Sequence, residues 1–209
     1  MAAPAFKIGD AVLTNSRFLD NETGFTGSGG GMYISSSLYG VNLLFDGNES
    51  NTGAALNFHG GSAVLYHATI GRPTRGAGSA INVNDSTFLT LKNSIISAYA
   101  TGLRSLGTTT EDYNLYFNNA VDYDATGGGT INFGAHNVAL KDPLFVNPAE
   151  HDYHLRWLSP AIGKGTNLGF PYDLDGRLRH VRMDIGAWVL NANLQHELVG
   201  FAEIADGSE

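Results

Sequence analysis

The sequence predicts an all-β protein: a right-handed parallel β-helix, or solenoid, of about five to six coils with a C-terminal cap. Three observations predict this fold. The 209 residues include 27 glycines, and glycine is a poor helix former. Short segments alternate apolar and polar side chains, as strands with one buried face do. These segments recur in two interleaved series with a period of about 25 residues, which is typical of the coils of a solenoid.

The first series of strands opens with a small residue and then alternates apolar and polar side chains. Its members begin 24, 25 and 22 residues apart. They are residues 31–35, 55–59, 80–84 and 102–106. Because each coil lies ~4.8 Å above the previous one, equivalent residues of these strands are expected to stack in columns.

The second series runs between the members of the first. Its segments are 14–18, 41–45, 66–70, 92–96 and 113–117. Four of them carry an asparagine at equivalent places, and His67 takes that place in the third. The asparagines are Asn15, Asn42, Asn93 and Asn114. Stacked amides can hydrogen-bond along the axis at a bend, so the pattern predicts an internal asparagine ladder.

Composition changes after the coils, and the chain divides into three parts. Residues 5–140 are expected to form the coils, 141–190 the cap, and 191–209 a tail of uncertain structure. Four of the six prolines lie between positions 143 and 171, which suits a cap that hides the unpaired edge of the last coil. The first coil shows no such cap, so we expect further coils upstream of Met1. An uncapped coil is also a template for end-to-end self-association.

Several protein classes are excluded. Ankyrin and tetratricopeptide repeats need helices, and leucine-rich repeats need a leucine ladder that is absent. The net charge is −8, and residues 1–110 carry six basic and six acidic side chains, so no basic face attracts nucleic acid. The chain has no cysteine, hence no disulfide or thiolate metal site. No apolar run approaches the ~18 residues of a membrane span.

A set of ordered motifs in the cap resembles a known family. The motifs are Asp142-Pro143-Leu144-Phe145, Asp152-Tyr153-His154-Leu155, Ser159-Pro160-Ala161-Ile162, Asp173-Leu174-Asp175-Gly176, Arg179 and Asp184-Ile185-Gly186-Ala187. They resemble the C-terminal part of choice-of-anchor Q type right-handed parallel β-helix repeat proteins, which belong to the pectin-lyase-like class. The resemblance implies a bacterial protein that is secreted or displayed at the cell surface and often handles polysaccharide. It supplies no catalytic residues.

The repeat predicts which side chains of the first strand series point outward. One outward column contains Tyr33, Asn57, Asn82 and Arg104, and the next contains Ser35, His59 and Asn84. Tyrosine can stack on sugar rings and asparagine can hydrogen-bond to hydroxyl groups. The candidate ligand-binding residues are Tyr33, Asn57, His59, Asn82, Asn84 and Arg104. Their expected partner is a polysaccharide or a cell-surface glycan.

An enzyme is the alternative interpretation of the same columns. Neither column contains a carboxylate, and a glycoside hydrolase needs two. A metal-free polysaccharide lyase or epimerase remains open: Arg104 would neutralise a uronate carboxylate while His59 or Tyr33 moved the proton. Its active coils could also lie upstream of Met1. We expect a scaffold and recognition module rather than an enzyme.

Two groups of acidic residues are candidates for further sites. Asp173, Asp175 and Asp184 imitate the start of a calcium loop, but Arg177 and Leu178 stand where a ligand and a glycine are needed. We therefore expect these aspartates to bind arginines and turn amides of the cap, and no cofactor. A second group could line a groove beside the last coils. It comprises Glu111, Asp112, Asp122 and Asp124.

Overall fold

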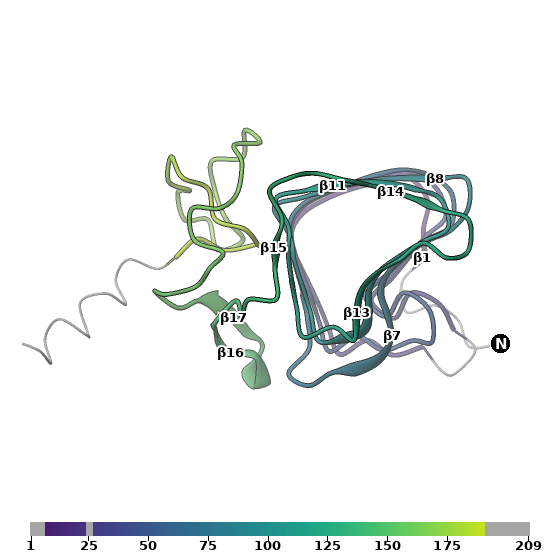
Figure 1. The fold of residues 1–209 in the computed structure, drawn as a ribbon, viewed down its shortest axis with the longest axis horizontal. Coiled ribbons are helices and arrows are strands. Elements are labelled where there is room, and N and C mark those ends of the chain that lie inside the picture. The colour runs from purple at the N-terminus through teal and green to yellow at the C-terminus, as the bar shows by residue number, and fades with distance from the viewer. Residues whose placement is uncertain (1–6, 24–26, 191–209) are drawn as a thin grey trace, which may run out of the picture.

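The computed structural model describes residues 7–23 and 27–190 and shows an all-β, parallel β-solenoid of about five turns (Figure 1). The only helical segment of this described part is the short 3-10 turn η1 (Pro148–Glu150). It contains no helix of the length and apolarity needed to cross a membrane. The expected tail, 191–209, and the first two residues of the expected coils lie outside the described residues.

The first strand series forms a six-stranded parallel sheet. Its strands, in spatial order, are β1 (Lys7–Ile8), β3 (Met32–Ile34), β5 (Leu56–Phe58), β7 (Gly76–Val83), β10 (Tyr99–Ser105) and β13 (Val121–Asp124). Each strand comes from a successive coil, so segments one sequence period apart become hydrogen-bonded neighbours in the sheet. The alternation of side chains predicted these strands because one face of the sheet lines the core.

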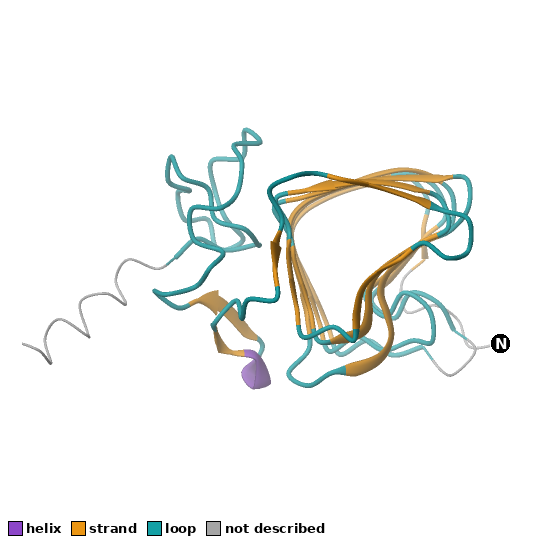
Figure 2. Cartoon of the chain, in the orientation of Figure 1, coloured by secondary structure: helices purple, strands orange, loops and turns teal. Residues whose placement is uncertain are grey.

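The second series forms a larger sheet that bends. Its strands are β2 (Ala11–Leu19), β4 (Leu38–Asp46), β6 (Gly61–Gly71), β8 (Thr87–Lys92), β9 (Ile95–Ser97), β11 (Thr108–Asp112), β12 (Leu115–Phe117), β14 (Thr130–Phe133) and β15 (Val138–Ala139). The first part of β6 pairs with β8 and its last part with β9. Between the two parts stands His67, with a φ of 52°. Figure 2 shows the resulting three-sided coils.

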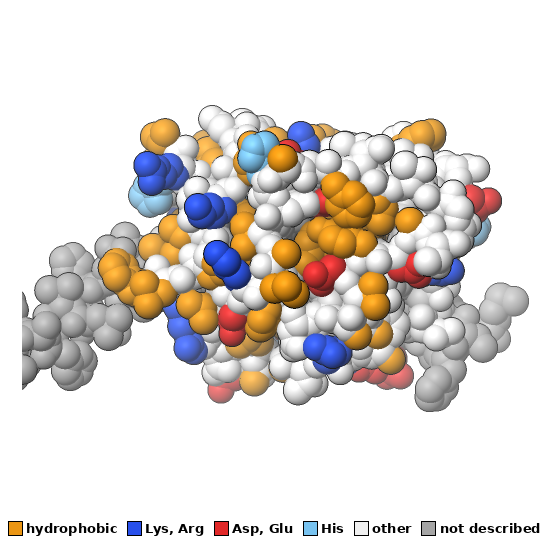
Figure 3. All heavy atoms as spheres, viewed as in Figure 1, with side chains coloured by type: hydrophobic (Ala, Val, Ile, Leu, Met, Phe, Trp, Pro, Cys, Tyr) orange, Lys and Arg blue, Asp and Glu red, His pale blue; other side chains and the backbone are white. Residues whose placement is uncertain are grey.

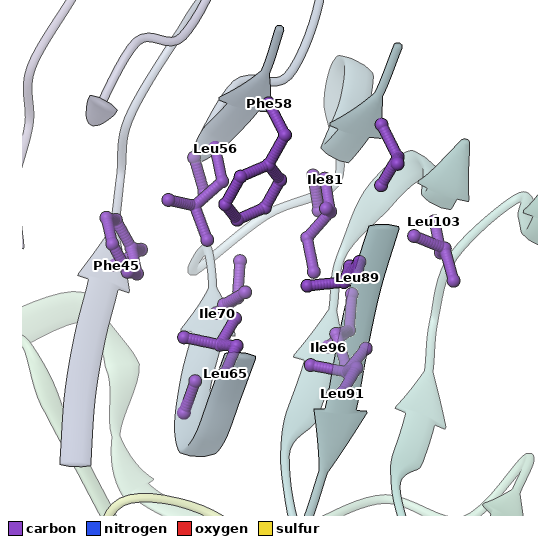
Figure 4. Packing of buried hydrophobic residues seen from close by; sticks show 14 of the residues in the cluster. Phe45, Leu56, Phe58, Leu65, Ile70, Ile81, Leu89, Leu91, Ile96 and Leu103 are labelled. Carbon is purple, nitrogen blue, oxygen red and sulfur yellow. The ribbon is translucent and has the colours of Figure 1, made fainter. Parts of the chain in front are cut away.

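The core lies inside the coils and is built from columns of apolar side chains. Met32, Leu56, Ile81 and Leu103 occupy one register column, and all four are fully buried. Figure 4 shows Leu56, Ile81 and Leu103 among the side chains that fill the interior. Each such residue stacks on its equivalent in the coils above and below, so every further coil buries more apolar surface and adds to the stability of the fold.

The part of the chain that we expected to form the cap lies beside the solenoid rather than over its last coil (Figure 1). This C-terminal module (141–190) contains an antiparallel pair, β16 (Phe145–Asn147) and β17 (Asp152–Leu155). The strands that follow the bend of the larger sheet form the third face of the solenoid. The apolar residues of the module pack on outward side chains of this third face, including Leu44, Ile95 and Leu115. The module covers this face along its length, because the face is apolar on its outside.

The predicted ladder is also different from expectation. Asn15, Asn42, His67 and Asn93 all have φ between 50° and 54° and mark the bend of successive coils. The side chains of Asn42 and Asn93 donate to backbone carbonyls of the C-terminal module, so the ladder lies on the outside of the coils. Asn42 Nδ2 donates to Asn15 Oδ1 (3.0 Å) and to the carbonyl of Tyr172 (2.9 Å). Asparagine and histidine tolerate this left-handed conformation better than most residues.

Asn114 and His67 differ from the other members of the ladder. Asn114 lies one register position further on, and Tyr113 takes the left-handed place with a φ of 59°. The amide of Asn114 donates to Glu111 Oε2 (2.8 Å) inside the coil. His67 is fully buried, and burial lowers its pKa to about 3, so the ring is neutral at physiological pH. His67 is therefore a structural substitute for asparagine.

Candidate functional site

The six ligand-binding candidates lie together on the outer face of the six-stranded sheet. Parallel pairing places Tyr33 beside Asn57, Asn57 beside Asn82, and Asn82 beside Arg104. His59 and Asn84 follow the ends of β5 and β7 and are joined by a 3.0 Å contact between Asn84 Nδ2 and His59 Nδ1. We call these six residues the strip. Its members are Tyr33, Asn57, His59, Asn82, Asn84 and Arg104.

The three asparagines of the strip form a closed hydrogen-bond network. Asn57 Oδ1 accepts from Asn82 Nδ2 (2.8 Å) and Asn84 Nδ2 (3.2 Å). Asn82 Nδ2 also donates to Asn84 Oδ1 (3.1 Å). Asn57 and Asn82 are 3% and 0% exposed. Their amides therefore hold the surface rigid, and a ligand would meet the neighbouring side chains first.

Tyr33 and His59 form the aromatic end of the strip. Their ring centroids are 5.6 Å apart with the planes tilted by 38°. Asn84 donates its amide hydrogen to Nδ1 of His59, so Nδ1 is the acceptor and the ring hydrogen lies on Nε2. Burial raises the pKa of Tyr33, so its hydroxyl is protonated at physiological pH. The phenol is consequently a hydrogen-bond donor and a stacking surface, and a poor base.

Arg104 forms the charged end of the strip, and its charge is matched. Its Nη1 donates to Asn82 Oδ1 (3.3 Å), and its Nε lies 3.6 Å from Asp124 Oδ2. Hydrogen bonds from the backbone and hydroxyl of Thr126 lower the pKa of Asp124, which keeps that carboxylate ionised. The charge of the guanidinium is therefore partly balanced by Asp124.

Asp124 extends the outward column, a position that the spacing of the earlier coils did not predict. β13 pairs with β10 so that Asp124 lies beside Arg104. The expectation that the column contains no carboxylate is wrong, because a further strand begins at Val121, before the spacing of the earlier coils would place it. The alternation of Asp122, Tyr123 and Asp124 was the available signal: Tyr123 packs inward on Tyr116 with ring centroids 4.5 Å apart.

Among the described residues of the outward column, Asp124 is the one carboxylate, whereas a glycoside hydrolase uses two. The column therefore does not supply both the acid and the base of a hydrolase. His59 and Arg104 lie two strand steps apart, which is ~10 Å, and Arg104 binds Asp124. Within the strip, therefore, no unpaired cation lies next to a base, although the lyase hypothesis needs both groups together.

The four acidic residues expected to line one groove lie in different environments. Glu111 is fully buried, and it accepts hydrogen bonds from the amides of Asn114 and Asn137 inside the solenoid. Burial raises the pKa of this carboxyl group. Asp112 contacts the ring of His136, and Asp122 accepts from Asn119 (3.0 Å). Of the four, only Asp124 lies beside the strip, next to Arg104.

The three aspartates of the calcium hypothesis bind groups of the protein itself. Asp173 accepts from the backbone amides of Asp175 (2.9 Å), Arg177 (2.8 Å) and Val189 (3.1 Å). Asp184 accepts from the amides of Gly163 and Leu190.

The third carboxylate, Asp175, contacts Arg17 Nη2 (2.6 Å) and His154 Nε2 (2.8 Å). Within the described ranges no three His, Cys, Asp or Glu side chains are grouped to hold a metal ion. Turn amides account for two of the three aspartates, as the cap interpretation expected, but the arginine that Asp175 binds most closely comes from the first coil.

Comparison with protein-family models, with curated proteins and with solved structures gives no match for this chain.

Proposed function

We propose that the protein is a recognition and scaffold module that binds a polysaccharide along the strip without cleaving it. The observation that carries this proposal is the Tyr33–His59 pair, held at the surface by a closed asparagine network. The pair offers aromatic surface and hydrogen-bond donors on a rigid sheet. Rigid side chains lose little conformational entropy when a ligand binds, which favours affinity.

The dimensions of the strip suit an extended polymer. Tyr33 and Arg104 are three strand steps apart, or ~14 Å. An aromatic ring packs against the apolar face of a sugar, while imidazole and guanidinium hydrogens donate to hydroxyl groups. A chain laid across the strands would meet the aromatic end first and the Arg104–Asp124 pair last.

The charges favour a neutral glycan over a polyuronate. The cation of Arg104 is balanced by Asp124, so an added carboxylate would compete with an ion pair already formed. The same pairing argues against lyase chemistry, which needs a cation to stabilise the uronate. We also propose that the protein is secreted or displayed at the cell surface. The support is the resemblance of the motifs between Asp142 and Ala187 to those of choice-of-anchor Q type proteins.

Affinity electrophoresis in gels containing soluble neutral or uronate polysaccharides tests the proposal. Tyr33→Ala and His59→Ala are expected to weaken retardation by a neutral glycan by up to about tenfold each, the value of an aromatic contact. Tyr39→Ala is the matched control, because Tyr39 is 39% exposed on β4 of the other sheet.

Three outcomes would contradict the proposal. Tyr39→Ala weakening retardation as much as Tyr33→Ala would place binding elsewhere, and an absence of retardation in every gel would remove the binding function. An increase in ultraviolet absorbance from unsaturated products on incubation with a polyuronate would instead establish the lyase alternative.

A further inference from the structure

The surface of the C-terminal module carries a hollow of about 420 Å³ that three basic side chains line. They are Lys164, His180 and Arg182, and all three are exposed. Within the described part of the chain, none of these side chains has a hydrogen bond or an ion pair. Figure 3 shows Lys, Arg and His side chains gathered over the module. We call this the basic hollow, and its donors are available to a ligand.

Two loops of the module bring the two cations to one edge of the basic hollow. The backbone amide of Gly165 donates to the carbonyl of Met183 (2.7 Å), which ties the loops together. A Cβ atom at Gly163 would lie 3.5 Å from Cβ of Arg182 and 3.6 Å from its Cδ. The stem of Arg182 therefore packs beside the residue that precedes Lys164.

Asp184 is the one carboxylate that lines the basic hollow. It is 4% exposed, and its two oxygens accept the amides of Gly163 (2.7 Å) and Leu190 (2.8 Å). Its negative charge also stabilises the buried guanidinium of Arg179. Asp184 is therefore occupied by the module itself, and it forms no ion pair with the two exposed cations.

A second hollow of about 380 Å³ adjoins the first, because His180 lines both. Phe170, Val181 and Met183 give it an apolar lining, and Val181 is 98% exposed. Arg179 also lines this apolar hollow, and its Nη1 is buried without a hydrogen-bond partner. A buried charged donor is seldom left unpaired, because its desolvation costs free energy. The apolar hollow thus combines apolar surface with an unused donor.

From these two hollows we propose that the C-terminal module binds an organic phosphate monoester. The phosphate group carries close to two negative charges above about pH 7, and Lys164 and Arg182 supply two positive charges. A guanidinium binds phosphate through parallel hydrogen bonds, and an ammonium acts as a point charge. The organic part of the ligand lies in the apolar hollow, and His180 donates a ring hydrogen between the two.

The phosphate site is separate from the strip. The strip belongs to the outer face of the six-stranded sheet, whereas the module packs on the third face of the solenoid. Lys164→Gln is therefore expected to leave retardation by a neutral glycan unchanged. Failure of the phosphate site would leave the glycan proposal standing, and the reverse also holds.

Isothermal titration calorimetry of the whole chain with three small probes is the test. The probes are phenyl phosphate, phenyl sulfate and inorganic phosphate, at about pH 8, where a phosphate monoester is a dianion. Phenyl sulfate has the same ring and one negative charge fewer, so it is expected to bind at least about fivefold more weakly. Inorganic phosphate lacks the ring and is also expected to bind more weakly than phenyl phosphate.

Substitutions at exposed positions identify the groups that bind. Lys164→Gln and Arg182→Gln each remove one positive charge and are expected to weaken the binding of phenyl phosphate by about tenfold. Lys141→Gln is the matched control, because Lys141 is an exposed cation of the same module that lines neither hollow. Val181→Ser is expected to weaken the binding of phenyl phosphate and to leave that of inorganic phosphate unchanged.

Four results would overturn the proposal. One is the absence of saturable phenyl phosphate binding, by calorimetry and by a rise in melting temperature. Equal binding of phenyl phosphate and phenyl sulfate would contradict the match of charges. A loss in Lys141→Gln as large as in Lys164→Gln would show attraction to positive charge without a site. Cosedimentation with phosphatidic acid vesicles, without binding of phenyl phosphate, would assign the surface to a lipid membrane instead.

Discussion

The guanidinium of Arg179 donates a 2.8 Å hydrogen bond to the side-chain oxygen of Asn42, 137 residues earlier in the chain. The same group also donates to the backbone carbonyls of Gly186 and Ala187. Arg179 is 5% exposed, and burial lowers its pKa to about 10, so it remains charged at physiological pH. This side chain therefore joins the C-terminal module to the asparagines at the bend of the coils.

Arg179→Ala is expected to lower the free energy of unfolding by at least about 2 kcal/mol. The substitution removes hydrogen bonds from a charged donor and leaves buried acceptors unpaired. Urea denaturation measures the change. Arg177→Ala is the control, because the Arg177 side chain is 41% exposed and its guanidinium lies 4.0 Å from Asp175 Oδ2; it should change stability by less than about 0.5 kcal/mol. Equal effects would refute the role assigned to Arg179.

Gly186→Ala is expected to destabilise the protein by about 1–3 kcal/mol. Gly186 has a φ of 102°, and a Cβ atom there would lie 2.9 Å from Cδ1 of Ile95. The backbone strain and the loss of close packing both oppose the substitution. Thermal denaturation should show a lower melting temperature for this variant. Gly9→Ala should be almost neutral, since nothing lies within 4 Å of its Cβ position.

The contact between His151 and Asp46 predicts a pH dependence of stability. His151 Nδ1 lies 2.5 Å from Asp46 Oδ2, and Nε2 lies 3.4 Å from Asp20 Oδ2. The hydrogen bond to Asp46 raises the pKa of His151, and burial raises the pKa of Asp46. The native state thus holds protons more tightly than the unfolded state at both groups.

Stability should therefore fall as the pH rises. The contribution of protonated His151 is complete below its unfolded pKa of about 6.5 and is lost as the pH passes its higher folded pKa. Denaturation curves from about pH 5 to pH 9 measure the loss. His151→Gln should flatten the upper part of this profile. A profile that stays equally steep in the variant would exclude His151 as its source.

Calcium is expected to leave the melting temperature unchanged. A bound ion must raise it, but the oxygens of Asp173 and Asp184 already accept backbone amides of the C-terminal module. Asp173→Ala should instead lower the free energy of unfolding by about 1–3 kcal/mol, because three amides lose their acceptor. A calcium-dependent rise that Asp173→Ala abolishes would restore the calcium hypothesis.

The strip shows which part of a site a repeat can predict. The columns Tyr33–Asn57–Asn82–Arg104 and His59–Asn84 followed from period and alternation alone, because parallel coils stack equivalent residues. The closed amide network did not follow, since it depends on side-chain rotamers. Asp124 was missed as a column member because its coil is shorter than the earlier ones, which shifts the register by a few residues.

The sequence by itself determined the solenoid, because each coil is specified locally by alternating side chains and by residues that tolerate a bend. It also identified the left-handed positions of Asn15, Asn42, His67 and Asn93 as equivalent. Only the tertiary structure decided that the ladder faces outward and that the C-terminal module covers a side of the solenoid. Those outcomes depend on contacts such as Arg179–Asn42, which join segments that share no period, and on apolar residues of the third face, whose outward and inward members look alike in the sequence.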